Sequence, residues 1–200
     1  MHKNIEVICF VRYAEGYMEI SFALVVVVAL RLLVPLLIFK WHIVGVLLAA
    51  LADALDVVLV DLLAHQLGET PGFGKDYQFF DKWLDMYYLA FAVVVSFSWK
   101  NALAKNTSII LFGYRLLGLI LFEITGIRKL FFFFPNLFEN FYIFYAVADR
   151  FFPKLVPKTI SRLLLVLFLL YIPKLIQEWA LHYAELHPWN WIKVTLGLSF

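Results

Sequence analysis

Six apolar runs, each about 20 residues long, divide the chain and leave only short polar segments between them. A helix that crosses the hydrocarbon core of a bilayer needs about that length, because its backbone polar groups must be satisfied within the segment itself. The runs therefore predict an all-α polytopic membrane protein, a bundle of about six transmembrane helices forming one domain over residues 1–200. The expected helices cover residues 17–39, 43–64, 77–99, 108–126, about 128–148 and 159–178.

The composition also indicates a membrane protein. Hydrophobic residues make up 64% of the chain, charged residues 16%, and the mean hydropathy is +0.84, so apolar side chains exceed what one soluble core could bury. The lipid bilayer is therefore the expected partner of an integral, multi-pass protein. A net charge of +2 without a run of lysines or arginines argues against a nucleic-acid partner. Cys9 is the only cysteine, which excludes an internal disulfide and a cysteine-based zinc site.

Both ends of the chain are expected to lie at the membrane surface. Residues 1–16 mix charged and apolar side chains and lack the apolar core and small-residue cleavage site of a signal peptide. They predict an interfacial helix that the mature protein retains. Aromatic residues such as Trp179 and Trp191 predict an interfacial tail over residues 179–200.

Four aspartates in otherwise apolar helices are the strongest sign of function. Ionised carboxylates inside a spanning helix are costly unless they are paired, hydrated or bound to metal. Asp53 and Asp56 are spaced i, i+3, and Asp81 and Asp85 are spaced i, i+4, so each pair lies on one face of its helix. Because the connection between the two helices is short, they are expected to be antiparallel neighbours. The sequence therefore predicts that the four carboxylates meet near one membrane surface.

Two kinds of partner are consistent with such a cluster. The hard divalent cations Mg²⁺ and Mn²⁺ prefer oxygen ligands and relieve carboxylate repulsion, and paired metal ions suit phosphoryl transfer. Two aspartate pairs that meet across a hairpin favour this interpretation. The alternative is that the acids form ion pairs with nearby cations, of which the candidates are Arg31, Lys82, Arg115 and Arg128.

Other polar residues lie inside the predicted membrane region. Arg115 suits a phosphate through its planar guanidinium, although an ion pair with Glu123 or an aspartate is the simpler interpretation. Asp61 is either a further ligand or a plain polar residue near the interface, and with Arg115 it is a candidate substrate-binding residue. One polar stripe, expected to face the bundle interior, consists of Asn136, Glu139 and Asn140.

The aspartate spacing resembles that of the CDP-alcohol phosphotransferases, six-helix membrane enzymes of phospholipid synthesis. Asp53-Ala-Leu-Asp56 and Asp81-Lys-Trp-Leu-Asp85 match the acids of their motif, D-x-x-D-G-x-x-A-R followed by G-x-x-x-D-x-x-x-D, and Arg31-Leu-Leu-Val-Pro35 resembles the R-x-x-x-P of their first helix. The resemblance implies that Asp53, Asp56 and Asp81 bind the metal, and that Asp85 is a ligand or the base that deprotonates an acceptor alcohol. It implies transfer of a substituted phosphate from a CDP-linked, or similar lipid- or nucleotide-linked, donor, with release of CMP.

The chain departs from this motif outside the four acids. The motif's glycine, alanine, arginine and later glycine are replaced here by Val57, Val60, Asp61 and Tyr77. In the family those glycines let the nucleotide approach the backbone, so their replacement weighs against recognition of cytidine. Two other functions therefore stay open: a non-catalytic relative that acts as a membrane scaffold or lipid-binding protein, and an ion or proton transporter that uses intramembrane aspartates. A homodimer is also left open.

Overall fold

The structure is a computed structural model that describes residues 21–69, 77–184, 186, 188–195 and 197. Over these residues the chain is helical and has no strand, which confirms the all-α class. Five segments are long and apolar enough to cross a membrane, so the protein is an integral, multi-pass membrane protein. The segments are Phe22–Phe39, His42–Leu67, Ala102–Thr125, Leu130–Phe151 and Ile160–Leu181. The interfacial helix expected at residues 1–16 lies outside the described residues.

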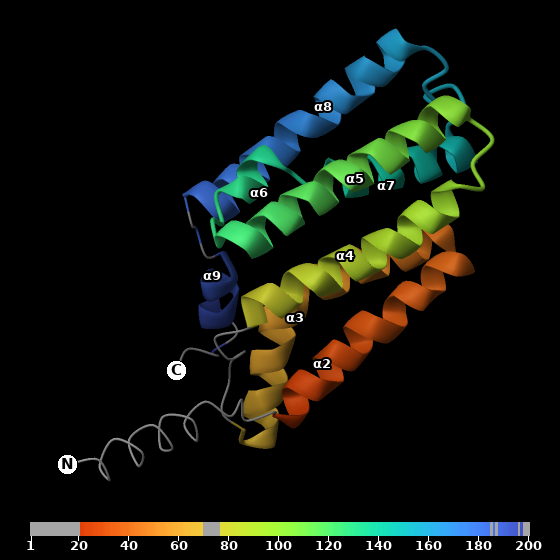
Figure 1. Ribbon diagram of the computed structural model, residues 1–200. Coiled ribbons are helices and arrows are strands. Elements are labelled where there is room, and N and C mark those ends of the chain that lie inside the picture. Colours follow the sequence, from red (N-terminus) through yellow and green to blue (C-terminus); the bar gives the residue numbers. More distant parts are fainter. Residues whose placement is uncertain (1–20, 70–76, 185, 187, 196, 198–200) are drawn as a thin grey trace, which may run out of the picture.

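Six long helices pack as two halves of one bundle (Figure 1). The first half consists of α2 (Phe22–Leu33), α3 (His42–Leu67) and α4 (Tyr77–Ser96), and the second of α5 (Ala102–Thr125), α7 (Leu137–Phe151) and α8 (Ile160–Glu178). The halves meet where α4 contacts α5 and α7, and where α3 contacts α7. The main apolar core lies at this junction and includes Leu89, Leu119 and Phe138.

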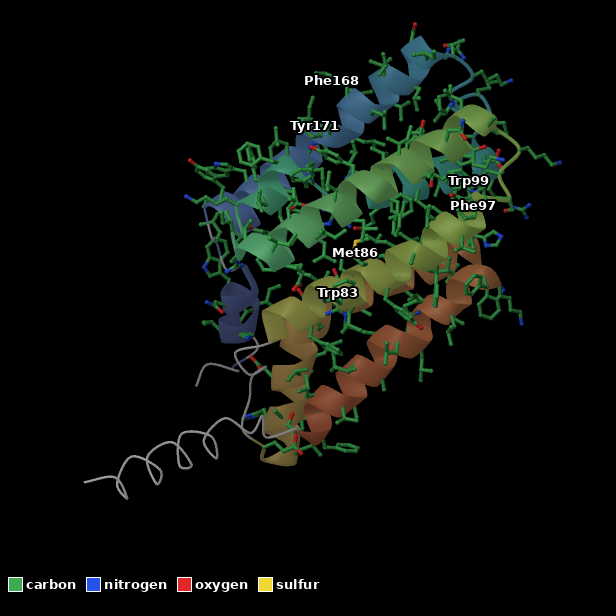
Figure 2. All side chains as sticks on the ribbon, in the orientation of Figure 1. Trp83, Met86, Phe97, Trp99, Phe168 and Tyr171 are labelled. Carbon is green, nitrogen blue, oxygen red and sulfur yellow. The ribbon has the colours of Figure 1, made fainter. Side chains whose placement is uncertain are left out.

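Large apolar side chains cover the outside of the bundle. Phe97, just after α4, and Phe168 of α8 are more than half exposed, and Figure 2 shows both on the outer surface together with Tyr171. Only 11% of the most apolar stretch of the Ile160–Leu181 segment is buried inside the protein. A contiguous apolar surface of this kind marks contact with a membrane or a partner, and the length of these helices identifies the bilayer.

Helices α2 and α3 are tied together at the end of the bundle where α4 begins. Gly68 ends α3 in the left-handed conformation, with a φ of 69°, and turns the chain back towards α2. The carboxylate of Glu69 then accepts hydrogen bonds from the amides of Phe22 and Ala23, each at 3.1 Å. A carboxylate at this position satisfies free amides and complements the helix dipole. This contact fixes the position of α2 along the length of α3.

At its other end, α2 continues as a 3₁₀-helix, η1 (Val34–Phe39), which packs tightly against α3 at Gly45. A Cβ at Gly45 would lie 2.6 Å from the Cα of Ile38 and from the carbonyl carbon of Leu37. We expect Gly45→Ala to lower the free energy of unfolding by about 1–3 kcal/mol, because backbone atoms must move apart. The measurement is the Tm in detergent.

Gly113→Ala is the matched control for this prediction. Gly113 also lies inside a long helix, α5, but a Cβ added there would meet no atom of another element within 4 Å among the described residues. Alanine is the better helix former, so this variant should keep or raise the Tm. Equal Tm losses in the two variants would contradict the close contact between α3 and η1.

Two expected helix boundaries were wrong, in both cases because an asparagine cap was not recognised. The predicted loop at residues 100–107 is mostly helix, because the side chain of Asn101 accepts a hydrogen bond from the amide of Ala104 at 3.2 Å and so starts α5. The single helix expected at residues 128–148 is two helices, α6 (Leu130–Phe133) and α7. Pro135 separates them, and Asn136 caps α7.

The end of the chain packs more closely on the bundle than an interfacial tail requires. After α8 the chain continues as a π-helical turn, η2 (Trp179–Tyr183), and then forms α9 (Pro188–Thr195). α9 contacts α3, near the start of α4 (Figure 1). This described C-terminal helix therefore lies at the end of the bundle where α4 begins.

Candidate functional site

The site is built around Arg31, where α2 meets α3 and α4. The buried face of α2 consists of residues three or four positions apart, namely Ala23, Leu24, Val27 and Arg31. Arg31 is only 4% exposed, so its side chain points into the bundle and not into lipid. This orientation brings its guanidinium to the aspartates of α3 and α4.

The Arg31 guanidinium binds three carboxylates. Its Nη1 lies 2.6 Å from Oδ1 of Asp81 on α4. Its Nη1 and Nη2 also pair with Asp56 and Asp53 of α3, respectively. The structure therefore brings together the acids of the two helices, as the helix spacing and the antiparallel hairpin predict. It also places a cation at their centre, which is the ion-pair alternative that the sequence left open.

Lys82 adds a second cation on the α4 side of the site. Its Nζ lies 2.7 Å from Oδ2 of Asp81, so three carboxylates face two cations. The side chain of Asp53 is 30% exposed, that of Asp81 19%, and that of Asp56 only 5%. Alternating charges offset part of the cost of holding ions inside the bundle. Asp53 is therefore the most exposed of the three acids.

Asp85 lies one turn further along α4 and pairs with a different arginine. Its Oδ2 lies 3.1 Å from Nη2 of Arg115 on α5. Arg115 also donates from Nη1 to the carbonyl oxygen of Phe134 at 3.0 Å, and its guanidinium lies over the ring of Phe131 at 4.7 Å. Of the alternatives left open for Arg115, the structure has the ion pair, with Asp85 as the partner and not Glu123.

One oxygen of Asp85 is left without a hydrogen bond. The side chain is 6% exposed, yet its Oδ1 has no hydrogen-bond partner within the described part of the chain. A buried acceptor without a donor costs about 1–3 kcal/mol and is uncommon in native structures. This oxygen is therefore a position at which the site can take a proton or a ligand.

A second buried polar cluster joins α7 to α8, and the sequence did not reveal it. Oε1 of Glu178 accepts a hydrogen bond from the Asn136 amide at 3.2 Å and lies 3.3 Å from Nζ of Lys174. The side-chain amide of Asn136 donates to Glu139 at 2.9 Å, so part of the predicted polar stripe does face the interior. The sequence signal for this cluster was Lys174 and Glu178, an oppositely charged pair spaced i, i+4 that directly follows Pro173 in an apolar run.

Asp61 lies outside both clusters. It forms an ion pair with Lys193 of α9 and is 5% exposed. The pair helps to hold the C-terminal helix on α3, where the two helices are in contact. The structure therefore gives Asp61 an ion-pair partner of its own and does not bring it to Arg31. Its predicted role in substrate binding stays a prediction.

The site has the kind of donor atom that the expected metal ions, Mg²⁺ or Mn²⁺, prefer. The present arrangement of these donors does not fit a metal ion. The donors are carboxylate oxygens, which these ions prefer. Among the described residues, however, no group of three His, Cys, Asp or Glu side chains is arranged to hold a metal ion. The guanidinium of Arg31 occupies the point at which the carboxylates of Asp53, Asp56 and Asp81 converge. A metal ion can bind there only if Arg31 moves away.

Comparisons with protein-family models, with curated proteins and with solved structures find no match to this chain. A function must therefore be inferred from the chemistry and geometry of the site, and not from a fold.

Proposed function

We propose that this chain is a membrane phosphotransferase that depends on Mg²⁺ or Mn²⁺. It would transfer a substituted phosphate from a CDP-linked, or similar lipid- or nucleotide-linked, donor to an alcohol at the membrane surface. The observation that carries the proposal is the convergence of Asp53, Asp56 and Asp81 on one point, with Asp85 one turn away. The resemblance of their spacing to that of the CDP-alcohol phosphotransferases gives the reaction class.

The balance of charge inside the bundle supports a bound cation. Within the described residues, the two clusters hold two more acids than cations. Excess charge in a medium of low dielectric constant is costly, so either protons or a cation must balance it. A divalent cation in place of the Arg31 guanidinium lowers this excess from two to one. The acids are Asp53, Asp56, Asp81, Asp85, Glu139 and Glu178, and the cations are Arg31, Lys82, Arg115 and Lys174.

In this proposal Asp85 accepts the proton of the attacking alcohol. The alcohol oxygen forms a bond to phosphorus while the bond from phosphorus to the departing CMP breaks, and the alcohol proton moves to the Asp85 carboxylate. Oδ1 supports this role, because no donor among the described residues is bonded to it. Arg115 holds the other oxygen at 3.1 Å and so orients the carboxylate, which makes it a positioning residue. Direct phosphate binding by Arg115 stays a prediction.

Binding of Mn²⁺ tests the proposal. Wild-type protein in nanodiscs should reduce the free-ion signal of Mn²⁺ in electron paramagnetic resonance. Asp81→Asn should weaken this binding at least about tenfold, because it removes the charge of the α4 carboxylate that meets the α3 carboxylates at Arg31. The variant should also stop CMP release from a CDP-linked lipid in the presence of an alcohol acceptor.

Asp61→Asn is the matched control for this experiment. It removes the charge of a buried acid on α3, but one that pairs with Lys193 outside the site. Its Mn²⁺ binding should equal that of the wild type. If Asp81→Asn also binds Mn²⁺ as the wild type does, the four-acid metal site is wrong.

A non-catalytic membrane scaffold or lipid-binding protein is the second candidate, and one observation favours it. Arg31 already pairs with the carboxylates of Asp53, Asp56 and Asp81, so a protein cation takes the position that a metal ion would need. A chain with all four aspartates of the motif changed to asparagine separates the candidates. Cellular function should survive this change in a scaffold, and it should be lost in an enzyme.

A further inference from the structure

The end of the bundle far from the aspartates carries many cations. It includes the turns between α2 and α3, between α4 and α5, and between α7 and α8, which Figure 1 shows at the same end of the bundle. Among the residues described there, Asp149 is the one acid. Six of the seven cations are exposed, and Lys105 is half-buried. The cations are Lys40, Lys100, Lys105, Arg150, Lys154, Lys158 and Arg162.

Aromatic residues place this end at the level of the lipid head groups. Nζ of Lys40 lies over the ring of Trp41 at 4.9 Å, and Trp99 follows α4 in the neighbouring turn. Tryptophan and lysine gather at the boundary between the hydrocarbon core and water, where the phosphates of phospholipids also lie. The cations of this end are therefore at the depth at which a lipid phosphate can meet them.

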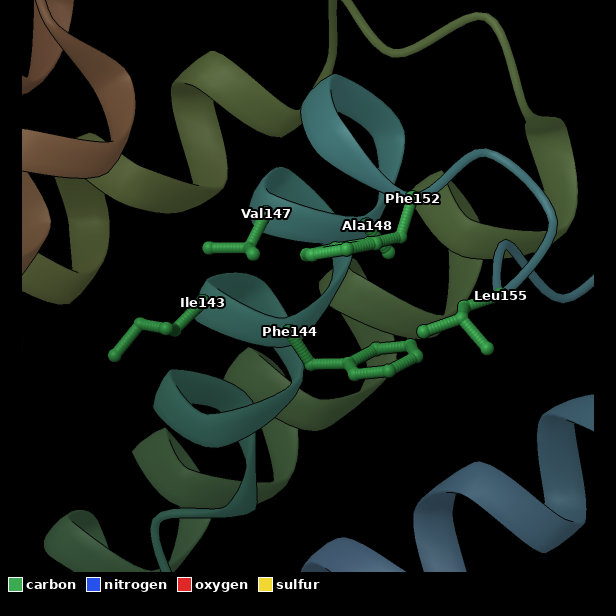
Figure 3. Close-up of a pocket in the computed structure, with 6 residues that line it drawn as sticks. All are labelled: Ile143, Phe144, Val147, Ala148, Phe152 and Leu155. Carbon is green, nitrogen blue, oxygen red and sulfur yellow. The ribbon is translucent and has the colours of Figure 1, made fainter.

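An apolar hollow lies where α7 ends, and two of these cations, Arg150 and Lys154, are close to its lining residues in the sequence. Its volume is about 190 Å³, and all six residues that line it are apolar (Figure 3). An apolar cavity of about 150 Å³ can hold a benzene molecule, so this hollow has room for part of a hydrocarbon chain. It is lined by residues of the second half of α7 and of the segment that follows α7. The lining residues are Ile143, Phe144, Val147, Ala148, Phe152 and Leu155.

We propose that the hollow and the adjoining cations form a binding site for one anionic phospholipid. An acyl chain fills the hollow, and the phosphate contacts Arg150 and Lys154. Lys154 lies between two lining residues in sequence. Arg150 lies three positions after the lining residue Val147 and seven after Ile143, so it is on the same face of α7. The excess of cations favours an anionic head group over a neutral one, since basic segments at the membrane surface attract anionic lipids. The site does not depend on the proposed phosphotransferase activity.

Native mass spectrometry of protein released from nanodiscs tests this site. In discs with equal amounts of phosphatidylglycerol and phosphatidylcholine, the wild-type protein should retain one phosphatidylglycerol. The double variant Arg150→Gln/Lys154→Gln should lower this affinity about 30-fold, because two of the nearest cations are lost. Both side chains are exposed, so the variant keeps its fold. Arg128→Gln/Lys129→Gln removes two cations from the other end of the bundle and should retain the lipid.

A second variant tests the hollow itself. Val147→Phe adds volume at the rim of the hollow, where Val147 is half-buried, and should release the lipid without lowering the Tm. Free glycerol phosphate, which has a phosphate but no acyl chain, should not displace the lipid. Equal retention of the two lipids, or retention by the Arg150→Gln/Lys154→Gln variant, overturns the proposal. A dimer in lipid-free detergent that Val147→Phe dissociates would assign the hollow to a second copy of the chain instead.

Discussion

The variant Arg31→Gln should unfold at a much lower temperature than the wild type when divalent cations are removed with a chelator. Loss of the guanidinium removes a cation that pairs with Asp53, Asp56 and Asp81, while Asp81 keeps its pair with Lys82. Removal of one partner from a buried group of charges costs about 3–5 kcal/mol, because the remaining charges stay buried without compensation. The Tm in detergent measures the loss.

Addition of Mg²⁺ to this variant separates the two candidate functions. In a metal-dependent enzyme, Mg²⁺ takes the place of the guanidinium and restores the Tm. At a concentration one hundred times its Kd, it contributes about 2.7 kcal/mol. In a scaffold, Mg²⁺ has no effect beyond that of Na⁺ at the same ionic strength. The double variant Arg31→Gln/Asp81→Asn should lose the rescue, since a carboxylate of the site is missing.

Arg31→Lys is the control that keeps the positive charge but removes the planar guanidinium. A lysine ammonium reaches fewer carboxylates at once, because it lacks the planar fork of donors that Arg31 presents to α3 and α4. Its Tm should therefore lie between those of Arg31→Gln and the wild type. If Arg31→Gln has the Tm of the wild type in the presence of chelator, Arg31 does not hold the three carboxylates together.

The meeting of α3 and α4 at their aspartates could be predicted from the sequence. The helical period puts Asp53 with Asp56 and Asp81 with Asp85, and a short connection makes neighbouring helices antiparallel. These are local properties that do not depend on the rest of the chain. For the same reason the long apolar helices could be predicted. The cap Asn101 was not recognised, because its polar segment resembles a loop, and Asn136 was expected inside a helix although it begins one.

The partner of each acid could not be predicted in the same way. Several cations were available, and the choice among them depends on how far α2 is shifted along α3. That shift is fixed by Glu69, whose carboxylate bonds the first amides of α2, and by the close contact at Gly45. Both are tertiary contacts with no periodic signal in the sequence. The pairing of Lys174 with Glu178 did have a local signal, but its connection to Asn136 again depends on tertiary packing.

Arg115→Met should also lower the free energy of unfolding by about 3–5 kcal/mol. In this variant Oδ2 of the buried Asp85 carboxylate loses Arg115 as its donor, and Oδ1 already has no donor among the described residues. Urea unfolding in mixed micelles, followed by tryptophan fluorescence, measures the change. Glu123→Gln is the control, since it removes a charge of α5 whose hydrogen bond with Trp83 is exposed, and it should cost less than about 1 kcal/mol.

The double variant Asp85→Leu/Arg115→Met shows how much of this loss comes from the stranded carboxylate. When both members of a buried ion pair are replaced by apolar residues, the change in stability is often small, so the double variant should recover most of the loss of Arg115→Met. If the loss in the double variant equals the sum of the losses in Asp85→Leu and in Arg115→Met, then Asp85 and Arg115 do not pair directly. The recovered protein is folded but has no carboxylate at position 85. Under the proposed function it should therefore bind a CDP-linked lipid without releasing CMP, which separates the chemical role of Asp85 from its contribution to the fold.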